Sequence, residues 1–310
     1  MRIFVTGATG VVGRRLVPLL LEAGHEITAG VRSASSAAEI GRQGAAIVEV
    51  DLFNRRAMER AIGGHDVLVN LATRIPKPSR ILLPWAWREN DHLRRVASAT
   101  LVDACLATGV HRFIQESFAP VYPDRGDQWI DESTAIQPVR YNRSVADAEA
   151  SAERFSQSGG IGIVLRFGGF YGPDALQTLE LIRAVKKGWA PLPGSPAAYI
   201  SSVSHDDAAT AVAAAVSLAS GAYNVVDDEP VTHRVLVDSL ADALGVPPPK
   251  LPPTWITPLF GSLGEMAARS LRMSNRKLRS ASGWRPRFAS IRQGWLVLVS
   301  RLDARRQAAA

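Results

Sequence analysis

The stretch Ile3-Phe4-Val5-Thr6-Gly7-Ala8-Thr9-Gly10-Val11-Val12-Gly13 decides the fold of this chain. It opens with an apolar run typical of a short buried strand, and three glycines then follow at a spacing of three residues. Residues 14–23 place leucines three and four positions apart, which predicts a helix, and Gly24 follows where a left-handed cap suits glycine. The stretch is therefore predicted to fold as a strand, a glycine-rich turn and a helix.

Each of the three glycines has its own role in such a turn. Gly7 permits the tight turn, Gly10 lets a ligand approach the backbone, and Gly13 lets the helix pack closely on the strand. Partial positive charge gathers at a helix N-terminus, so Thr9 and the amides of Val11 and Val12 would face an anion there. The alternative is an ordinary glycine-rich turn. Because the turn lies in a strand-helix-strand unit of about 30 residues, we expect a cradle for the pyrophosphate of a dinucleotide.

Outside this unit, apolar strands alternate with helix-length segments. Further strands are predicted at residues 26–31, 45–50, 66–70, 112–115 and 161–166, and a long amphipathic helix at 92–107. A helix that carries the chain back to the same edge of a sheet requires parallel pairing. The fold class is therefore α/β, a doubly wound parallel sheet of the Rossmann type.

The regular alternation ends after Arg166. A helix from Asp206 or Asp207 through Leu218, a strand at 222–226 and a helix at 233–244 are predicted, and the proline-rich residues 247–253 read as a surface strap. We expect a dinucleotide-binding domain at 1–166 and a smaller, irregular C-terminal substrate lobe at 167–310. Within that lobe, residues 200–228 are expected to pack back on the first domain.

Composition excludes several classes of protein. The 310 residues are 46% apolar and 21% charged, which fits a folded globular chain rather than a disordered one. Cys105, a lone cysteine, excludes an internal disulfide framework, and the six histidines show no metal-ligand spacing, so no metal is expected. No apolar run reaches the ~18 residues of a membrane span. The apolar run at the N-terminus is too short for the hydrophobic region of a signal peptide, so we expect a cytoplasmic protein without a membrane partner.

Positive charge is concentrated at the C-terminal end. Residues 250–310 hold twelve Lys and Arg against two acids, while the whole chain carries +7. Such an end could grip phosphates, or it could be a solvated face with a disordered tail from Arg305 onward. No nucleic-acid motif accompanies the charge, so nucleic acid is not expected. The expected partner is a small-molecule substrate, and the chain is expected to be a monomer or homodimer.

The end of the second strand bears on the choice of nucleotide. NAD-binding proteins place an acid there for the ribose hydroxyls, whereas this chain has Arg32 and Ser33. An arginine can pair with a 2′-phosphate that an acid would repel. The sequence therefore favours NADP over NAD, which stays possible; the alternative is an ordinary surface arginine.

These residues resemble the short-chain dehydrogenase/reductase superfamily, in its extended or atypical epimerase/dehydratase branch. The segments that carry the resemblance are Thr6–Gly13, Asp51-Leu52, Asn70–Ala72, Leu165–Pro173, Tyr223–Pro230 and Gly283–Pro286. The resemblance implies an enzyme that binds a nicotinamide dinucleotide. It also implies further cofactor contacts: Asp51 and Leu52 at adenine, Leu71, Ala72 and Thr73 beside the riboses, and Phe167 and Gly169 near the carboxamide.

The catalytic positions of that family are only partly present. In the family a lysine four residues after a tyrosine lowers the phenol pKa from about 10, so that the tyrosine can exchange a proton near neutrality. Here Tyr141 is followed by Val145, and no lysine occurs between Lys77 and Lys186. The usual hydroxyl position falls on Phe118, with Ser117 one place earlier. Tyr141 and Ser117 are the candidate catalytic residues; the alternative for Tyr141 is a helix-entry residue without a chemical role.

Two functions remain open at this stage. One is an NADP-dependent oxidoreductase or epimerase-like enzyme acting on a small carbonyl, hydroxyl or nucleotide-sugar substrate. The other is an NADP-binding redox sensor or regulatory protein that has lost turnover, a reading motivated by Phe118 and Val145. Trp85, Trp87, Trp129 and Trp189 either line an apolar substrate cleft or pack in the core of a lobe.

Overall fold

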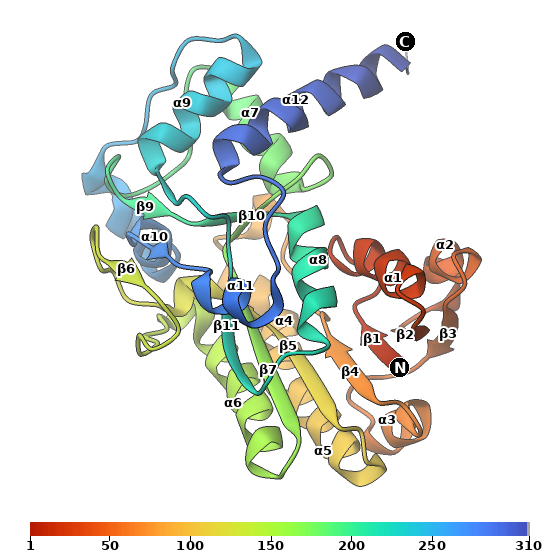
Figure 1. The fold of residues 1–310 in the computed structure, drawn as a ribbon. Helices are drawn as coiled ribbons and strands as arrows, with labels where there is room; N and C mark the ends of the chain where they lie inside the picture. Colours follow the sequence, from red (N-terminus) through yellow and green to blue (C-terminus); the bar gives the residue numbers. More distant parts are fainter. Residues whose placement is uncertain (309–310) are drawn as a thin grey trace.

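A computed structural model describes residues 1–308 and contains a seven-stranded, entirely parallel sheet (Figure 1). The strands lie in the order β3-β2-β1-β4-β5-β7-β11. Their bounds are β1 Arg2–Thr6, β2 Glu26–Val31, β3 Ala46–Glu49, β4 Val67–Asn70, β5 Arg112–Phe118, β7 Ile161–Phe167 and β11 Gly221–Val225. The order reverses direction between β1 and β4, which is where ligands gather in sheets of this kind. The expected doubly wound fold is confirmed.

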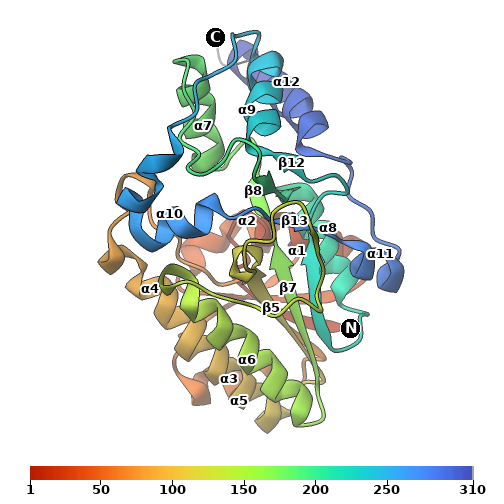
Figure 2. The same cartoon turned by 90° about the vertical axis from the view of Figure 1, so that its left-hand side faces the viewer.

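Helices cover both faces of the sheet because its strands are apolar on both sides. On one face, α1 (Gly13–Glu22) and α8 (His205–Ala215) bury Leu16, Leu20 and Val212 against β1 and β7, with α2 (Ala38–Arg42) at the edge. On the other face, α3 (Arg55–Ile62), α5 (Ser98–Thr108) and α6 (Arg143–Gln157) pack around Phe113 and Phe155 (Figure 2). The two cores hold the carboxyl ends of the strands at one edge.

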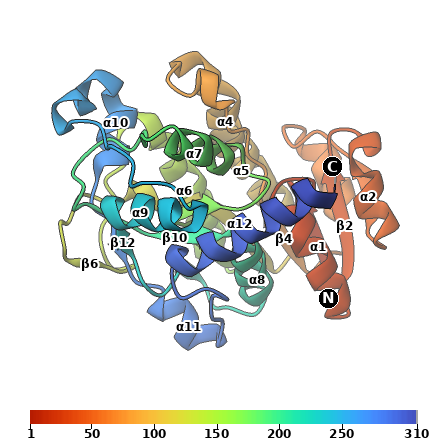
Figure 3. The same ribbon diagram turned by 90° about the horizontal axis from the view of Figure 1, so that it is seen from above.

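Three further helices lie over that edge (Figure 3). They are α7 (Leu176–Lys186), α9 (His233–Leu244) and α12 (Ile291–Ala308), and they enclose a separate core centred on Trp295. Short strand pairs join them to the sheet domain: β8 (Gly169–Tyr171) with β10 (Ser202–Ser204), β9 (Tyr199–Ile200) with β12 (Val231–Thr232), and β6 (Trp129–Ile130) with β13 (Arg272–Met273). The segment 200–228 contributes α8 and β11 to the sheet domain.

Near the C-terminus, η7 (Thr254–Phe260) and α10 (Gly261–Ala268) follow the proline-rich strap, and α11 (Arg276–Ser282) packs beside β11. The strap itself has no helix or strand beyond a bridge between Lys250 and Trp189. None of the helices in residues 1–308 is long and apolar enough to cross a membrane.

The helix predicted at 92–107 is confirmed, and it contains a π-helical segment η4 (Leu93–Ala97) between α4 (Arg88–His92) and α5. Two other local expectations were wrong. The start of α8 is capped by Ser204, whose Oγ accepts from the amide of Asp207 at 3.0 Å, rather than by either aspartate. Finally, α12 continues helically to Ala308, so the expected disordered tail is wrong that far, and residues 309–310 lie outside the described residues.

Candidate functional site

The glycine-rich turn between β1 and α1 forms an open cradle. Gly7 has φ +69°, and a Cβ there would lie 2.4 Å from the carbonyl oxygen of Leu71. A Cβ on Gly13 would lie 2.3 Å from the carbonyl oxygen of Gly7, so helix and turn touch backbone to backbone. A Cβ on Gly10, in contrast, would meet only that same oxygen, at 3.1 Å. Gly7 and Gly13 therefore serve packing, while the exposed Gly10 leaves room for a ligand.

The amides beyond Gly10 are available to an anion. The Gly10 N–H bonds back to Gly7 O at 2.9 Å and holds the turn, whereas no acceptor within residues 1–308 binds the N–H groups of Val11 and Val12. Both amides precede the first turn of α1, where the helix dipole favours negative charge. Thr9 is exposed beside them. The residues present thus fit the pyrophosphate of a dinucleotide.

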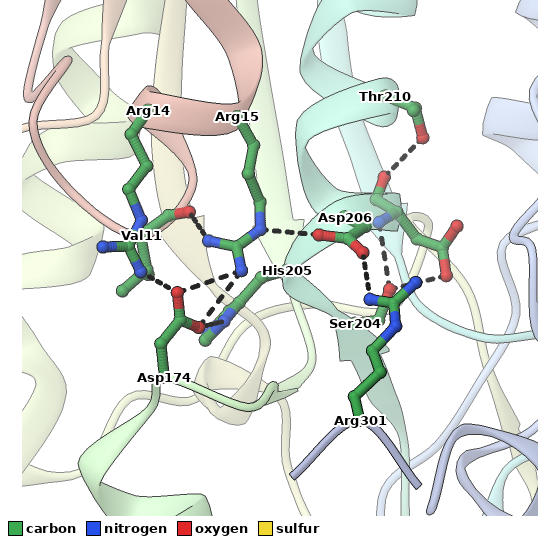
Figure 4. Close-up of polar contacts among 10 residues, drawn as sticks. Val11, Arg14, Arg15, Asp174, Ser204, His205, Asp206, Thr210 and Arg301 are labelled. Carbon is green, nitrogen blue, oxygen red and sulfur yellow. Dashed lines mark hydrogen bonds and ion pairs between the residues drawn. The ribbon is translucent and has the colours of Figure 1, made fainter. Parts of the chain in front are cut away.

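An ion-pair cluster links this cradle to the C-terminal half of the chain (Figure 4). Arg14 and Arg15, in the first turn of α1, both bind Asp174, which follows β8. Arg15 also donates to Asp206 at 2.6 Å and to the carbonyl of Val11 at 2.7 Å. The cluster holds the segment after β8 against the mouth of the cradle.

Arg32 lies exposed at the end of β2, as a reader of a 2′-phosphate would. Its guanidinium forms an ion pair with Glu89 at 3.2 Å, and Arg74 approaches the same carboxylate at 3.4 Å. Two arginines thus share one acid, which leaves an excess of positive charge. Ser33 is exposed next to Arg32 and bonds to Ser35.

The remaining expected cofactor residues fall into exposed and buried groups. Asp51 is exposed and accepts from the amide of Phe53, with Leu52 half-buried beside it, while Ala72 and Thr73 are accessible next to the cradle. Leu71 is buried, and its carbonyl oxygen lies against the backbone of Gly7. The structure thus brings the glycine turn and the segment after β4 together.

The segment after β7 departs from what the resemblance implies. Phe167 is fully buried in the sheet core and its ring packs 5.2 Å from that of Phe170, so its side chain does not reach a crevice in this arrangement. Gly169 bonds through its amide to Ser201 and is half-buried. A contact from Phe167 would therefore have to come from its backbone, because the side chain is used for packing.

Tyr141 lies in η6 (Arg140–Asn142), just before α6. Its ring meets that of Trp87 edge-on at 4.5 Å, and within residues 1–308 no group hydrogen-bonds its hydroxyl. Burial raises the pKa of Tyr141, and the nearby Arg94 counteracts this only in part. Val145, at the position where the family has lysine, is completely buried. Tyr141 is thus a neutral phenol at physiological pH.

Ser117 belongs to a buried network rather than to an open site. Its hydroxyl donates to Glu149 of α6, which also holds Arg166 through two hydrogen bonds of 2.9 and 2.7 Å. Arg166 in turn donates to the Tyr122 hydroxyl at 2.7 Å, and burial raises the pKa of Tyr122 to about 12. Because the Glu149–Arg166 pair is buried, its hydrogen bonds offset the cost of removing both charges from water. The network joins β5, α6 and β7, and the Ser117 hydroxyl is already engaged in it.

The sequence reasoning missed Arg94. It lies in the π-helical segment η4, is only 6% exposed, and reaches Glu116 of β5 at 3.4 Å. The Arg94 Nε and the Glu116 Oε2 lack partners in the described chain, as does Nδ2 of buried Asn90 one turn earlier. π-Helical segments and unsatisfied buried polar atoms both occur at functional sites. In the sequence, the one feature that indicates a buried Arg94 is its place beside the apolar stripe of the predicted helix.

A Rossmann sheet with a glycine cradle at its switch point defines a nucleotide-binding class of protein. Residues 7–218 match the family model described as NAD(P)H-binding. A 3-diazoavenalumate denitrifying reductase from Streptomyces is 34% identical, over 95% of this chain and 99% of its own length.

Solved structures share the fold. UDP-glucose 4-epimerase of Thermotoga maritima superposes with a TM-score of 0.80 at 20% identity, over 99% of this chain and all of that one. The dTDP-glucose 4,6-dehydratase of Streptomyces venezuelae, solved with NAD, gives 0.80 at 21% identity, over 99% and 98% of the two chains.

The chain belongs to the NAD(P)H-binding family. It is an NAD(P)-dependent oxidoreductase-type enzyme that shares its fold with epimerases and dehydratases.

Proposed function

We propose that this protein is an NADPH-dependent reductase of a small-molecule substrate. The observation that carries the proposal is the cradle: Gly10 open to a ligand and two free amides at the start of α1. Gly7, Thr9, Gly10, Val11, Val12 and Gly13 would hold the pyrophosphate, and a bound reduced nicotinamide supplies hydride. The reductase that is similar over the full length supports reduction over epimerisation.

Arg32 supports NADP as the preferred cofactor. The side chain is exposed, and Glu89 is its only ion partner within residues 1–308. A 2′-phosphate carries more charge than a carboxylate and pairs with arginine in a bidentate manner. Arg74, on the other side of Glu89, would retain that acid when Arg32 turns to the phosphate.

The substrates that such a site could reduce differ in whether their reduction consumes a proton. Carbonyl reduction consumes a proton, NADPH + H⁺ + R₂C=O → NADP⁺ + R₂CHOH, and here Tyr141 is the proposed donor. With its raised pKa and no lysine at position 145, this phenol is a reluctant acid. A well-aligned site can still work without tuned acid catalysis, at a loss of about 10²–10⁴-fold.

A diazonium substrate makes no such demand. Replacement of nitrogen by hydride balances without a proton, NADPH + R–N₂⁺ → NADP⁺ + R–H + N₂. The free hydroxyl of Tyr141 would then serve only as a binding contact. We infer this second substrate class from the denitrifying reductase together with the buried Val145.

One experiment separates these possibilities. NADPH oxidation is followed under argon with a panel of aldehydes and ketones and, separately, with an arenediazonium salt, against reactions without protein. Tyr141→Phe should slow carbonyl reduction and spare the diazonium reaction. Of the two stereoisomers of [4-²H]NADPH, only one should transfer its deuterium to the product. Phe at 141 keeps the contact with Trp87, so loss of packing is not the cause.

Binding of NADPH with no oxidation across both panels, and a change in protease sensitivity between NADPH and NADP⁺, would contradict the reductase and indicate an NADP-binding sensor. Absence of binding by either reduced coenzyme, measured by calorimetry, would refute both functions.

A further inference from the structure

A cavity of about 620 Å³ opens beside Tyr141. The segments that line it come from three parts of the chain: residues 81–95 including η3 (Pro84–Trp87), the start of α6 with η6, and η7 with α10. Figure 2 shows α4, α6 and α10 around this place. The volume lies within the ~300–1,000 Å³ range of small-molecule sites. The cavity thus has the size of a substrate pocket, and the proposed proton donor stands in its wall.

Part of the wall of this cavity is apolar, and the rest carries charged and hydroxyl side chains. Trp87 and Tyr141 contribute aromatic rings to this part, and Leu82, Leu259 and Phe260 contribute side chains that cannot hydrogen-bond. Leu259, in this lining, is 77% exposed. A polyhydroxylated sugar would lose hydrogen bonds to water at the apolar part, whereas a flat aromatic ring would gain contact area.

Cations outnumber acids around the same cavity. Arg140 and Arg143 are exposed and have no ion partner within residues 1–308. Arg95 pairs with Asp147 at 3.2 Å, and the cavity's own acid, Asp91, accepts a hydrogen bond from Ser144 at 2.6 Å. An unpaired guanidinium fork suits a carboxylate. Both free arginines line the same cavity as Tyr141, so an anion held by them would share the cavity with the phenol.

We propose that this cavity binds an aromatic carboxylate of cinnamate size, its ring between Trp87 and the η7 side chains and its carboxylate on Arg140 and Arg143. The proposal rests on the proposed function, because it names the substrate class of that site. It also differs from the nucleotide sugars named by the structural neighbours.

Calorimetry with trans-cinnamate, cinnamamide and UDP-glucose on NADP⁺-loaded protein tests it. Cinnamate should bind at least tenfold more tightly than its neutral amide. Arg140→Gln with Arg143→Gln should remove that preference, and Trp87→Leu should weaken both ligands. Arg56→Gln, which removes an exposed charge on α3, is the matched control and should change nothing.

Equal binding of cinnamate and cinnamamide, no effect of the arginine pair, or tighter UDP-glucose binding that depends on the same arginines would each overturn the proposal. The same titrations on protein without coenzyme keep the two proposals apart. If cinnamate binds as expected but NADP⁺ does not bind, only the proposed function is refuted. If NADP⁺ binds and turnover occurs but cinnamate binding does not depend on the arginines, only the substrate class is refuted.

Discussion

Replacing two glycines of the same turn by alanine should have opposite consequences. The added methyl at Gly13 would lie 2.3 Å from the Gly7 oxygen and 2.6 Å from the Ala8 Cα, both backbone atoms that cannot turn aside. At Gly10 the methyl meets one oxygen at 3.1 Å and otherwise points into open space. Gly13→Ala should therefore damage the fold, and Gly10→Ala should damage only the cofactor site.

The magnitudes follow from these contacts. Overpacking against rigid atoms costs about 1–3 kcal/mol, occasionally more. Gly13→Ala should therefore lower the free energy of unfolding by about 3 kcal/mol or more. At Gly10 the one close contact, at 3.1 Å, leaves open space on the other sides of the methyl, so Gly10→Ala should cost less than Gly13→Ala, about 1 kcal/mol at most. Displacing a phosphate from one or two amides forfeits charged hydrogen bonds worth about 1.5–3 kcal/mol each. NADPH affinity should then fall at least ~10-fold, since each tenfold is about 1.4 kcal/mol.

Urea unfolding and calorimetric NADPH titration of both variants measure these two quantities. Gly63→Ala, whose Cβ would lie 3.5 Å from the Glu59 oxygen at ordinary contact distance, is the control and should match the wild type in both. Unchanged NADPH affinity in a folded Gly10→Ala variant would show that the pyrophosphate does not pass over Gly10. Such a result would contradict the cradle, and with it the proposed function.

Three further predictions concern charged and titrating side chains. Arg32→Asp should weaken NADPH at least tenfold and NADH little; equal losses in binding titrations would show that Arg32 does not read the phosphate. Arg94→Gln leaves Glu116 without its cation in a buried site and should cost about 3–5 kcal/mol in urea unfolding, which Arg94→Lys should partly restore; a Gln variant as stable as the wild type would contradict the pairing. Burial lowers the pKa of His205 and of His233 to about 4. Because the unfolded chain binds these protons more readily, the free energy of unfolding falls as the pH drops from about 6.5 toward 4. Replacing either by Gln should reduce the loss of unfolding free energy between pH 7.5 and 5.5 by roughly 1.4 kcal/mol, and an unchanged loss would show that the imidazole is not buried neutral.

Local patterns in the sequence were sufficient for the sheet and the cradle. Strand β2 occupies the predicted residues 26–31 and α9 the predicted 233–244, because periodicity and terminal glycines act within a few residues of where they stand. The glycine turn is local for the same reason, since its backbone needs are set by neighbours in the chain. The π-helical break at 93–97 escaped this reasoning because an apolar stripe reads the same through a one-residue bulge.

The chemical surroundings of the site depended on tertiary structure. Glu149 reaches Ser117 from 32 residues away, Arg94 meets Glu116 across 22, and η7 closes a cavity begun by Trp87 far earlier in the chain. Residue spacing carries no information on such meetings, because the direction of a side chain and its partner are set by how helices dock on the sheet. The sequence by itself determined the glycine turn between β1 and α1 and the absence of a lysine at position 145. Only the packed chain decided which charges and rings surround Tyr141 instead.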